Sequence, residues 1–125
     1  YIAKNNLRDT IILRGNKTKE ELKVAYKKSH FLLLPSKSEG WPKAVAEAMF
    51  WGCIPIATQV SCVSNMLDNE NRGLFLKMNL ESDVKNIGNL ISEQKEFQIK
   101  SDLAKKWSRN YTLDRFETEI QKLLS

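Results

Sequence analysis

Residues 31–57 limit what this chain can fold into more than any other part of its sequence. They begin with a short apolar run, Phe31 to Leu34, which predicts a buried strand. A polar loop then leads to Pro42, a residue favoured at the first helical position, and an apolar helical segment follows until Gly52 closes it. Cys53 to Ala57 predicts the next strand. This order of strand, helix and strand indicates an α/β fold with a parallel sheet.

The same alternation continues on both sides of this segment. Thr10 to Leu13 and Arg72 to Leu76 are short and apolar and predict two more strands, which makes four. Thr18-Lys19-Glu20-Glu21 places a hydroxyl and a carboxylate three positions apart, the pattern of a capping box, and predicts a helix that reaches about Lys28. Ile2 to Leu7 predicts the end of a further helix.

The last third of the chain changes character. From about Leu80 to Leu124 the apolar residues keep helical spacing, and Thr112 is placed to cap the last helix. We therefore expect a Rossmann-like parallel sheet with flanking helices, followed by a helical tail. The length of 125 residues suits one compact domain rather than two.

The composition is ordinary for a globular protein and excludes some classes of function. No apolar run approaches the roughly 20 residues of a membrane span. The net charge of +5 comes from Lys and Arg scattered among acidic residues, without a basic block, so we expect no nucleic-acid partner. Cys53 and Cys62 match no zinc or redox motif and are expected to be reduced thiols. The single histidine, His30, has no nucleophile or metal ligand near it in the sequence.

The loop from Pro35 to Trp41 is the first candidate for a binding site. Ligands of parallel α/β sheets bind outside the carboxyl ends of the strands, and this loop joins such an end to a helix. Free backbone amides and the positive end of the helix dipole favour an anion such as phosphate there. Ser36, Ser38 and Gly40 are small and polar, so a ligand could approach the backbone closely. Similar loops are also common without a ligand.

Two charged residues, Lys43 and Glu47, share one stripe of an otherwise apolar helix at i, i+4 spacing. They could form a surface ion pair worth roughly a few tenths of a kcal/mol. Alternatively, a phosphate offsets the unfavourable position of the Lys43 cation in the first turn, and the Glu47 carboxylate accepts hydrogen bonds from a sugar diol. The spacing alone leaves both interpretations open.

Residues Phe31 to Ala57 strongly resemble the signature of family-4 retaining glycosyltransferases. That signature has a strand, Pro-Ser, two residues, Glu-Gly, a helix with Glu-Ala-Met, and then a short segment with a glycine, a proline and an alanine, here Gly52, Pro55 and Ala57. Its core is two glutamates with seven residues between them, here Glu39 and Glu47. The resemblance implies that residues 1–125 form a partial C-terminal, donor-binding domain of a GT-B enzyme. The N-terminal acceptor domain and the basic residues that hold the diphosphate are then expected upstream, outside this chain.

The resemblance also implies roles for single residues. The residue matching Glu47 binds the ribose hydroxyls of a nucleotide sugar, and the one matching Glu39 lies near the transferred sugar and the diphosphate and is the catalytic candidate. The other donor-binding positions line the sugar and the phosphates: Ser38, Gly40, Trp41, Lys43 and Ala44. Such enzymes look independent of metals and cofactors, because amides, the helix dipole and basic side chains stabilise the leaving nucleoside diphosphate.

The sequence departs from the family in two places. Ser61-Cys62 and the three residues after them stand where the family often has Gly-Gly and a Glu, which bears on any contact there. Trp41-Pro42-Lys43 replaces a more usual Phe-Gly-aliphatic run, so the preferred donor is expected to differ from that of typical members.

Two other kinds of protein are alternatives. A nucleotide-sugar isomerase (epimerase) of the same GT-B fold binds the same kind of ligand. A non-catalytic α/β module such as a response-regulator-like receiver needs an Asp at the end of a strand, whereas the expected strand ends carry Gly15, Pro35 and Thr58.

The family's usual role is hexosyl transfer in the synthesis of cell-surface or lipid-linked saccharides in bacteria. This implies a cytoplasmic enzyme, with peripheral association at the inner face of the membrane left open. We expect the 125-residue chain alone to fold as a monomer but to transfer no sugar.

Overall fold

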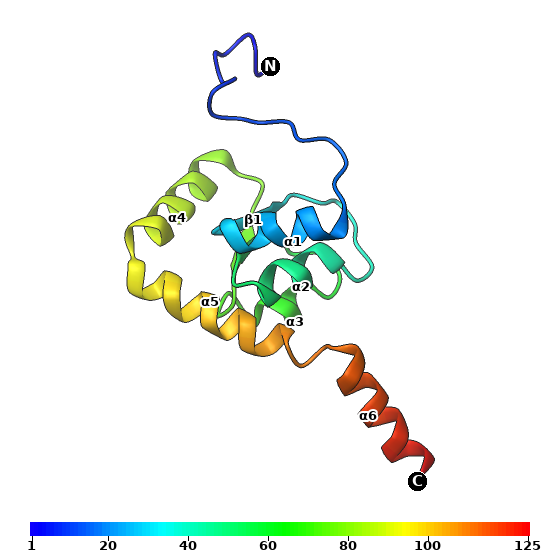
Figure 1. Ribbon diagram of the computed structural model, residues 1–125. Coiled ribbons are helices and arrows are strands. Elements are labelled where there is room, and N and C mark those ends of the chain that lie inside the picture. Colours follow the sequence, from blue (N-terminus) through cyan, green and yellow to red (C-terminus); the bar gives the residue numbers. More distant parts are fainter.

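The computed structural model describes residues 1–125 and contains six helices and three strands (Figure 1). In chain order these elements are α1 (Lys19–Lys28), β1 (Phe31–Leu34), α2 (Lys43–Phe50), β2 (Ile54–Thr58), α3 (Val63–Leu67), β3 (Leu74–Leu76), α4 (Leu80–Ser92), α5 (Gln94–Ser108) and α6 (Leu113–Leu124). The predicted α/β class and the helical tail are confirmed.

The sheet is parallel throughout, in the order β1-β2-β3. Phe31 pairs with Ile54 and Leu34 pairs with Ala57, so β1 and β2 end at the same edge of the sheet. All five residues of β2 are buried, because this strand lies between its two neighbours and is covered by helices. The register therefore brings the segments that follow β1 and β2 to the same edge.

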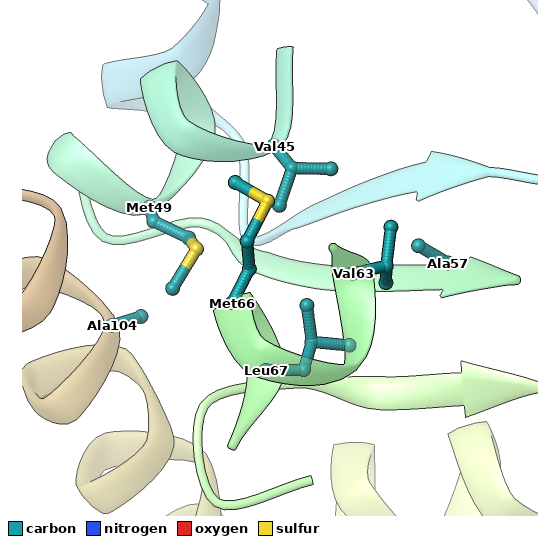
Figure 2. Packing of buried hydrophobic residues seen from close by; sticks show 7 residues of the cluster. All are labelled: Val45, Met49, Ala57, Val63, Met66, Leu67 and Ala104. Atoms are coloured by element: carbon teal, nitrogen blue, oxygen red, sulfur yellow. The ribbon is translucent and has the colours of Figure 1, made fainter. Parts of the chain in front are cut away.

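The hydrophobic core lies between the sheet, α2, α3 and α5 (Figure 2). Its seven buried side chains come from these four elements: Val45, Met49, Ala57, Val63, Met66, Leu67 and Ala104. Burying a side chain of the size of leucine or methionine stabilises the fold by about 1.5–3 kcal/mol. Ser108 Oγ also donates to the Ala46 carbonyl at 2.6 Å, which ties α5 to the middle of α2.

Three of the predicted helix-terminal signals are confirmed. Thr18 Oγ1 accepts from Glu21 N at 3.2 Å, and Glu21 Oε2 accepts from Thr18 N at 2.9 Å, which completes the capping box of α1. Thr112 Oγ1 accepts from Arg115 N at 3.3 Å at the start of α6. Gly52 follows α2 with a φ of +90°, a conformation that glycine adopts without steric penalty.

Three predictions about the backbone are wrong. Thr10 to Leu13 forms no strand, because no neighbouring strand pairs with it, and Leu13 is 83% exposed. Ile2 to Leu7 forms turns rather than the end of a helix, and Asn6 interrupts it with a φ of +54°. Pro42 is the N-cap of α2 and not its first helical residue.

One helix was not predicted. α3 has only five residues and follows β2 after a short turn. It buries three apolar side chains, Val63, Met66 and Leu67, in the core between α2 and the sheet (Figure 2). These side chains anchor the turn that precedes α3 to the core.

The two ends of the chain extend away from this core (Figure 1). α6 has no buried residue, and residues 8–18 contribute none either. None of the six helices combines the length and the apolar character needed to cross a bilayer.

Candidate functional site

The predicted loop lies at the edge of the sheet where β1 and β2 end. Its first half is held by the end of β2, because the Thr58 hydroxyl donates to the Ser36 carbonyl. Ser36 Oγ in turn donates to Glu39 Oε1 at 2.6 Å, a length typical of a hydroxyl bound to a carboxylate. Glu39 is partly buried, whereas Ser38 is exposed and makes no hydrogen bond through its side chain. The catalytic candidate is therefore oriented by its own loop.

Gly40 is held through its backbone. Its carbonyl oxygen accepts from Ser61 Oγ at 3.0 Å and from Cys62 Sγ at 3.2 Å. Its φ is not positive, and a Cβ built on it would meet no atom within 4 Å. The space beside Gly40 is therefore open, and its backbone conformation does not itself require a glycine. The close approach of a ligand to Gly40 stays a prediction.

The start of α2 carries backbone donors without partners. The N–H groups of Trp41, Lys43 and Ala44 make no hydrogen bond within the protein. No side chain caps α2, and its first turn contains no acidic residue. Unpaired N–H groups and the positive end of a helix dipole together favour a bound anion. This part of the predicted donor site therefore offers three free backbone donors, and phosphate binding there stays a prediction.

The Trp41 ring belongs to an aromatic cluster that the sequence did not reveal. Its centroid lies 6.2 Å from that of Trp107 and 5.8 Å from that of Tyr111. The Arg72 guanidinium lies over the Trp107 ring of this cluster, 5.1 Å from its centroid. Tyr111 follows the end of α5, and no local pattern in the sequence connects Trp107 and Tyr111 with Trp41. The cluster anchors the loop to the end of α5.

Lys43 and Glu47 do not form the ion pair that their spacing allows. Neither residue takes part in a salt bridge, and Glu47 Oε2 instead accepts from Tyr26 Oη at 3.4 Å. Burial raises the pKa of the Tyr26 phenol, and the negative charge of Glu47 raises that pKa further. The carboxylate therefore faces α1 and is not neutralised by a cation of its own helix.

The Glu47 side chain lines a shallow cleft of about 280 Å³ between α1 and α2. The cleft is lined by Lys19, Leu22, Lys23, Tyr26, Glu47 and Trp51. Three larger clefts, of about 640, 620 and 580 Å³, lie at residues 110–119, beside α1 and around His30 and Phe97, and none of the three touches the predicted loop. The smaller cleft is the one that contains the exposed Glu47 carboxylate.

The structure thus brings the predicted residues into two adjoining places. The loop and first turn hold Ser38, Glu39, Gly40, Trp41, Lys43 and Ala44. Glu47 lies one turn further along α2, roughly 6 Å along the helix axis from Lys43 at 1.5 Å per residue. The other chemically distinctive residues lie outside the site. Cys53 is buried and donates to the Tyr26 carbonyl at 3.0 Å, and His30 packs edge-on against Phe97.

Comparison with known proteins assigns the chain to a family. The family model described as glycosyl transferases group 1 matches residues 1–112. The chain belongs to the group 1 glycosyl transferases. An uncharacterised glycosyltransferase of Methanocaldococcus jannaschii is 27% identical over 124 residues, which are 98% of this chain and 35% of that protein. The chain therefore spans about a third of the length of this curated relative.

Solved structures support the fold. Sucrose-phosphate synthase from Thermosynechococcus elongatus superposes with a TM-score of 0.83 at 19% identity, over 98% of this chain and 31% of the other. The C-terminal domain of a group 1 glycosyl transferase (LpcC) from Francisella tularensis gives a TM-score of 0.75 at 19% identity, over 88% of this chain and 57% of the other. The parallel sheet with flanking helices is thus that of a GT-B C-terminal domain.

Proposed function

We propose that this chain is the donor-binding part of a glycosyltransferase and that it binds a nucleoside diphosphate sugar along residues 38–47. The observation that carries the proposal is the start of α2. There the unpaired N–H groups of Trp41, Lys43 and Ala44 lie between the loop that holds Glu39 and the cleft that holds Glu47. Membership in the group 1 glycosyl transferases supports the assignment of a sugar-transfer reaction.

In this proposal the diphosphate binds at the three amides. An anion there also favours the Lys43 cation, which the helix dipole otherwise disfavours in a first turn. The Glu47 carboxylate, free of any salt bridge, accepts hydrogen bonds from the ribose diol. When the bond from the anomeric carbon to the leaving phosphate oxygen breaks, negative charge grows on that oxygen, and the oriented amides stabilise it.

Glu39 is proposed to act beside the transferred sugar. Its carboxylate is oriented by Ser36 and partly buried, which favours a fixed contact with a sugar hydroxyl over free movement. We propose transfer with retention of the anomeric configuration and without a metal ion, on the strength of the resemblance of residues 31–57 to family-4 enzymes.

The acceptor is proposed to bind to an upstream domain of the full enzyme. The product is then a cell-surface or lipid-linked saccharide, made on the cytoplasmic side of the membrane. In this proposal the chain binds donor by itself but transfers no sugar, since it lacks an acceptor site. Analysis of the products of the full enzyme distinguishes a transferase, which lengthens an acceptor, from an isomerase, which returns a rearranged donor.

A thermal-shift screen with UDP, GDP, ADP and their sugars tests the proposal. A ligand of the native state at 100 times its Kd stabilises the protein by about 2.7 kcal/mol. For a domain of this size we expect the Tm to rise by about 10 °C. No shift with any of these ligands, confirmed by calorimetric titration, would contradict the proposed function.

A further inference from the structure

Two side chains outside the proposed donor site converge on its loop. Ser61 Oγ and Cys62 Sγ both donate to the carbonyl oxygen of Gly40, at 3.0 and 3.2 Å. A carbonyl oxygen has two lone pairs and can accept both hydrogen bonds. The two donors lie 21 and 22 residues after Gly40 in the chain, so these contacts join two separate segments at the sheet edge.

The turn that supplies the donors is itself fixed. It follows β2 directly, and the N–H of Val60 donates to the Thr58 carbonyl at 2.9 Å. At its other end Val63 begins α3 and is 1% exposed. Ser61 has a φ of +48°, a conformation that residues with a Cβ seldom adopt. The fold therefore holds Ser61 in an unfavourable backbone conformation in which its hydroxyl reaches the Gly40 carbonyl.

Holding the Gly40 carbonyl also fixes the peptide group that follows it. The C=O and N–H of a trans peptide lie in one plane and point in opposite directions, and the chain contains no cis peptide bond. The N–H of Trp41 therefore points away from Ser61 and Cys62, and it has no partner in the protein. Donors at the carbonyl also polarise the peptide and strengthen this N–H as a donor.

We propose that Ser61 and Cys62 are positioning residues of the donor site. They clamp the peptide between Gly40 and Trp41 from one side, while Tyr111 and Trp107 hold the Trp41 ring from the other. The clamp presents the Trp41 N–H to a nucleoside diphosphate. This inference rests on the proposed function, and it assigns the two residues a contact with the loop rather than with the ligand.

Four single substitutions and one double variant separate the effect of the hydrogen bonds from that of their surroundings. Ser61→Gly removes the hydroxyl and suits a positive φ, so it adds no backbone strain. Cys62→Ala removes the thiol, whereas Cys62→Ser keeps a donor at the same position. Ser92→Ala is the matched control, because Ser92 Oγ donates to the Gly88 carbonyl at 3.0 Å within α4. The double variant Ser61→Gly, Cys62→Ala removes the whole clamp.

The first measurement needs no ligand. Nitrogen-15 relaxation gives backbone order parameters for Gly40 and Trp41, which we expect near the rigid value of about 0.85 in the wild type and below about 0.6 in the double variant. Cys62→Ser and Ser92→Ala should keep the wild-type values. Unchanged order parameters in the double variant would overturn the clamp, whether or not a nucleotide binds.

The second measurement is calorimetric titration with UDP, GDP and ADP. The nucleotide that binds the wild type should bind the double variant about 3- to 10-fold more weakly, the effect of weakening one or two hydrogen bonds. Cys62→Ser should bind more tightly than Cys62→Ala. A disordered loop with unchanged affinity would overturn the positioning role. Absence of binding to the wild type would instead overturn the proposed function, and the positioning role with it.

Discussion

The two ends of α2 differ in how their backbone groups are satisfied. At the C-terminal end three successive N–H groups donate back into the last turn of the helix: those of Trp51, Gly52 and Cys53. Ser101 Oγ, from α5, also donates to the Gly52 carbonyl at 2.8 Å. At this end nearby protein groups occupy the polar backbone groups, as is usual where a chain is packed for stability.

The N-terminal end is different. Three of its N–H groups lack a partner, no side chain caps it, and the loop before it is held by side chains that contact its carbonyls. An unsatisfied helix end is costly unless water or a ligand satisfies it. Under the proposed function, one helix therefore serves two purposes, packing at one end and ligand binding at the other, and the two ends should respond oppositely to substitution.

The largest expected effect lies in the packed part of the helix. Met49 is fully buried in the core, and Met49→Ala leaves a cavity that should lower the free energy of unfolding by about 2–5 kcal/mol. Denaturant unfolding measures this loss. Leu123→Ala is the control, since Leu123 in α6 is 83% exposed and its removal should change stability by less than about 0.5 kcal/mol. Equal effects of the two substitutions would contradict the assigned core.

A smaller effect is expected where α2 ends. Gly52→Ala forces a residue with a Cβ to adopt a φ of +90°, and that Cβ would lie 2.7 Å from Lys105 Cε. The Lys105 side chain is long and can move, so the backbone conformation dominates, and we expect a loss of about 1–2 kcal/mol. Thermal unfolding would show it as a lowered Tm. A Tm at or above that of the wild type would show that this end is less constrained than described.

A substitution at the N-terminal end of α2 should change the stability of the protein least. Gly40→Val adds a side chain to open space, so the free energy of unfolding should change by less than about 0.5 kcal/mol. The same side chain should obstruct a ligand that approaches the loop and weaken nucleotide binding. Parallel unfolding and titration experiments make the comparison. Unaltered affinity would place the phosphates away from Gly40.

The sequence predicted those features that depend on local chemistry. The capping box at Thr18 and the left-handed Gly52 are determined by a few neighbouring residues, and both are confirmed. Thr10 to Leu13 has the composition of a strand, but a strand also needs a partner, which no local pattern supplies. α3 is too short for its apolar spacing to stand out.

For the site, too, the sequence predicted the local features and missed the contacts between distant residues. The motif located the loop and the two glutamates, because their spacing along one loop and one helix is a local property. The contact of Glu47 with Tyr26 joins residues 21 positions apart, and it decides against the ion pair with Lys43. The hydrogen bonds from Ser61 and Cys62 to Gly40 are equally distant in sequence. Only the folded chain shows such contacts.

The central claim, that α2 binds a nucleotide sugar, is tested most directly by titrating the best-binding nucleotide into wild type, Glu47→Ala and Lys43→Ala. If Glu47 holds the ribose diol, its loss removes charge-assisted hydrogen bonds worth roughly 1.5–3 kcal/mol, or about 10- to 150-fold in Kd. Stability without ligand should barely change, because Glu47 is exposed and in no salt bridge. Lys43→Ala is the control that keeps the carboxylate. A Kd for Glu47→Ala equal to that of the wild type would contradict the account.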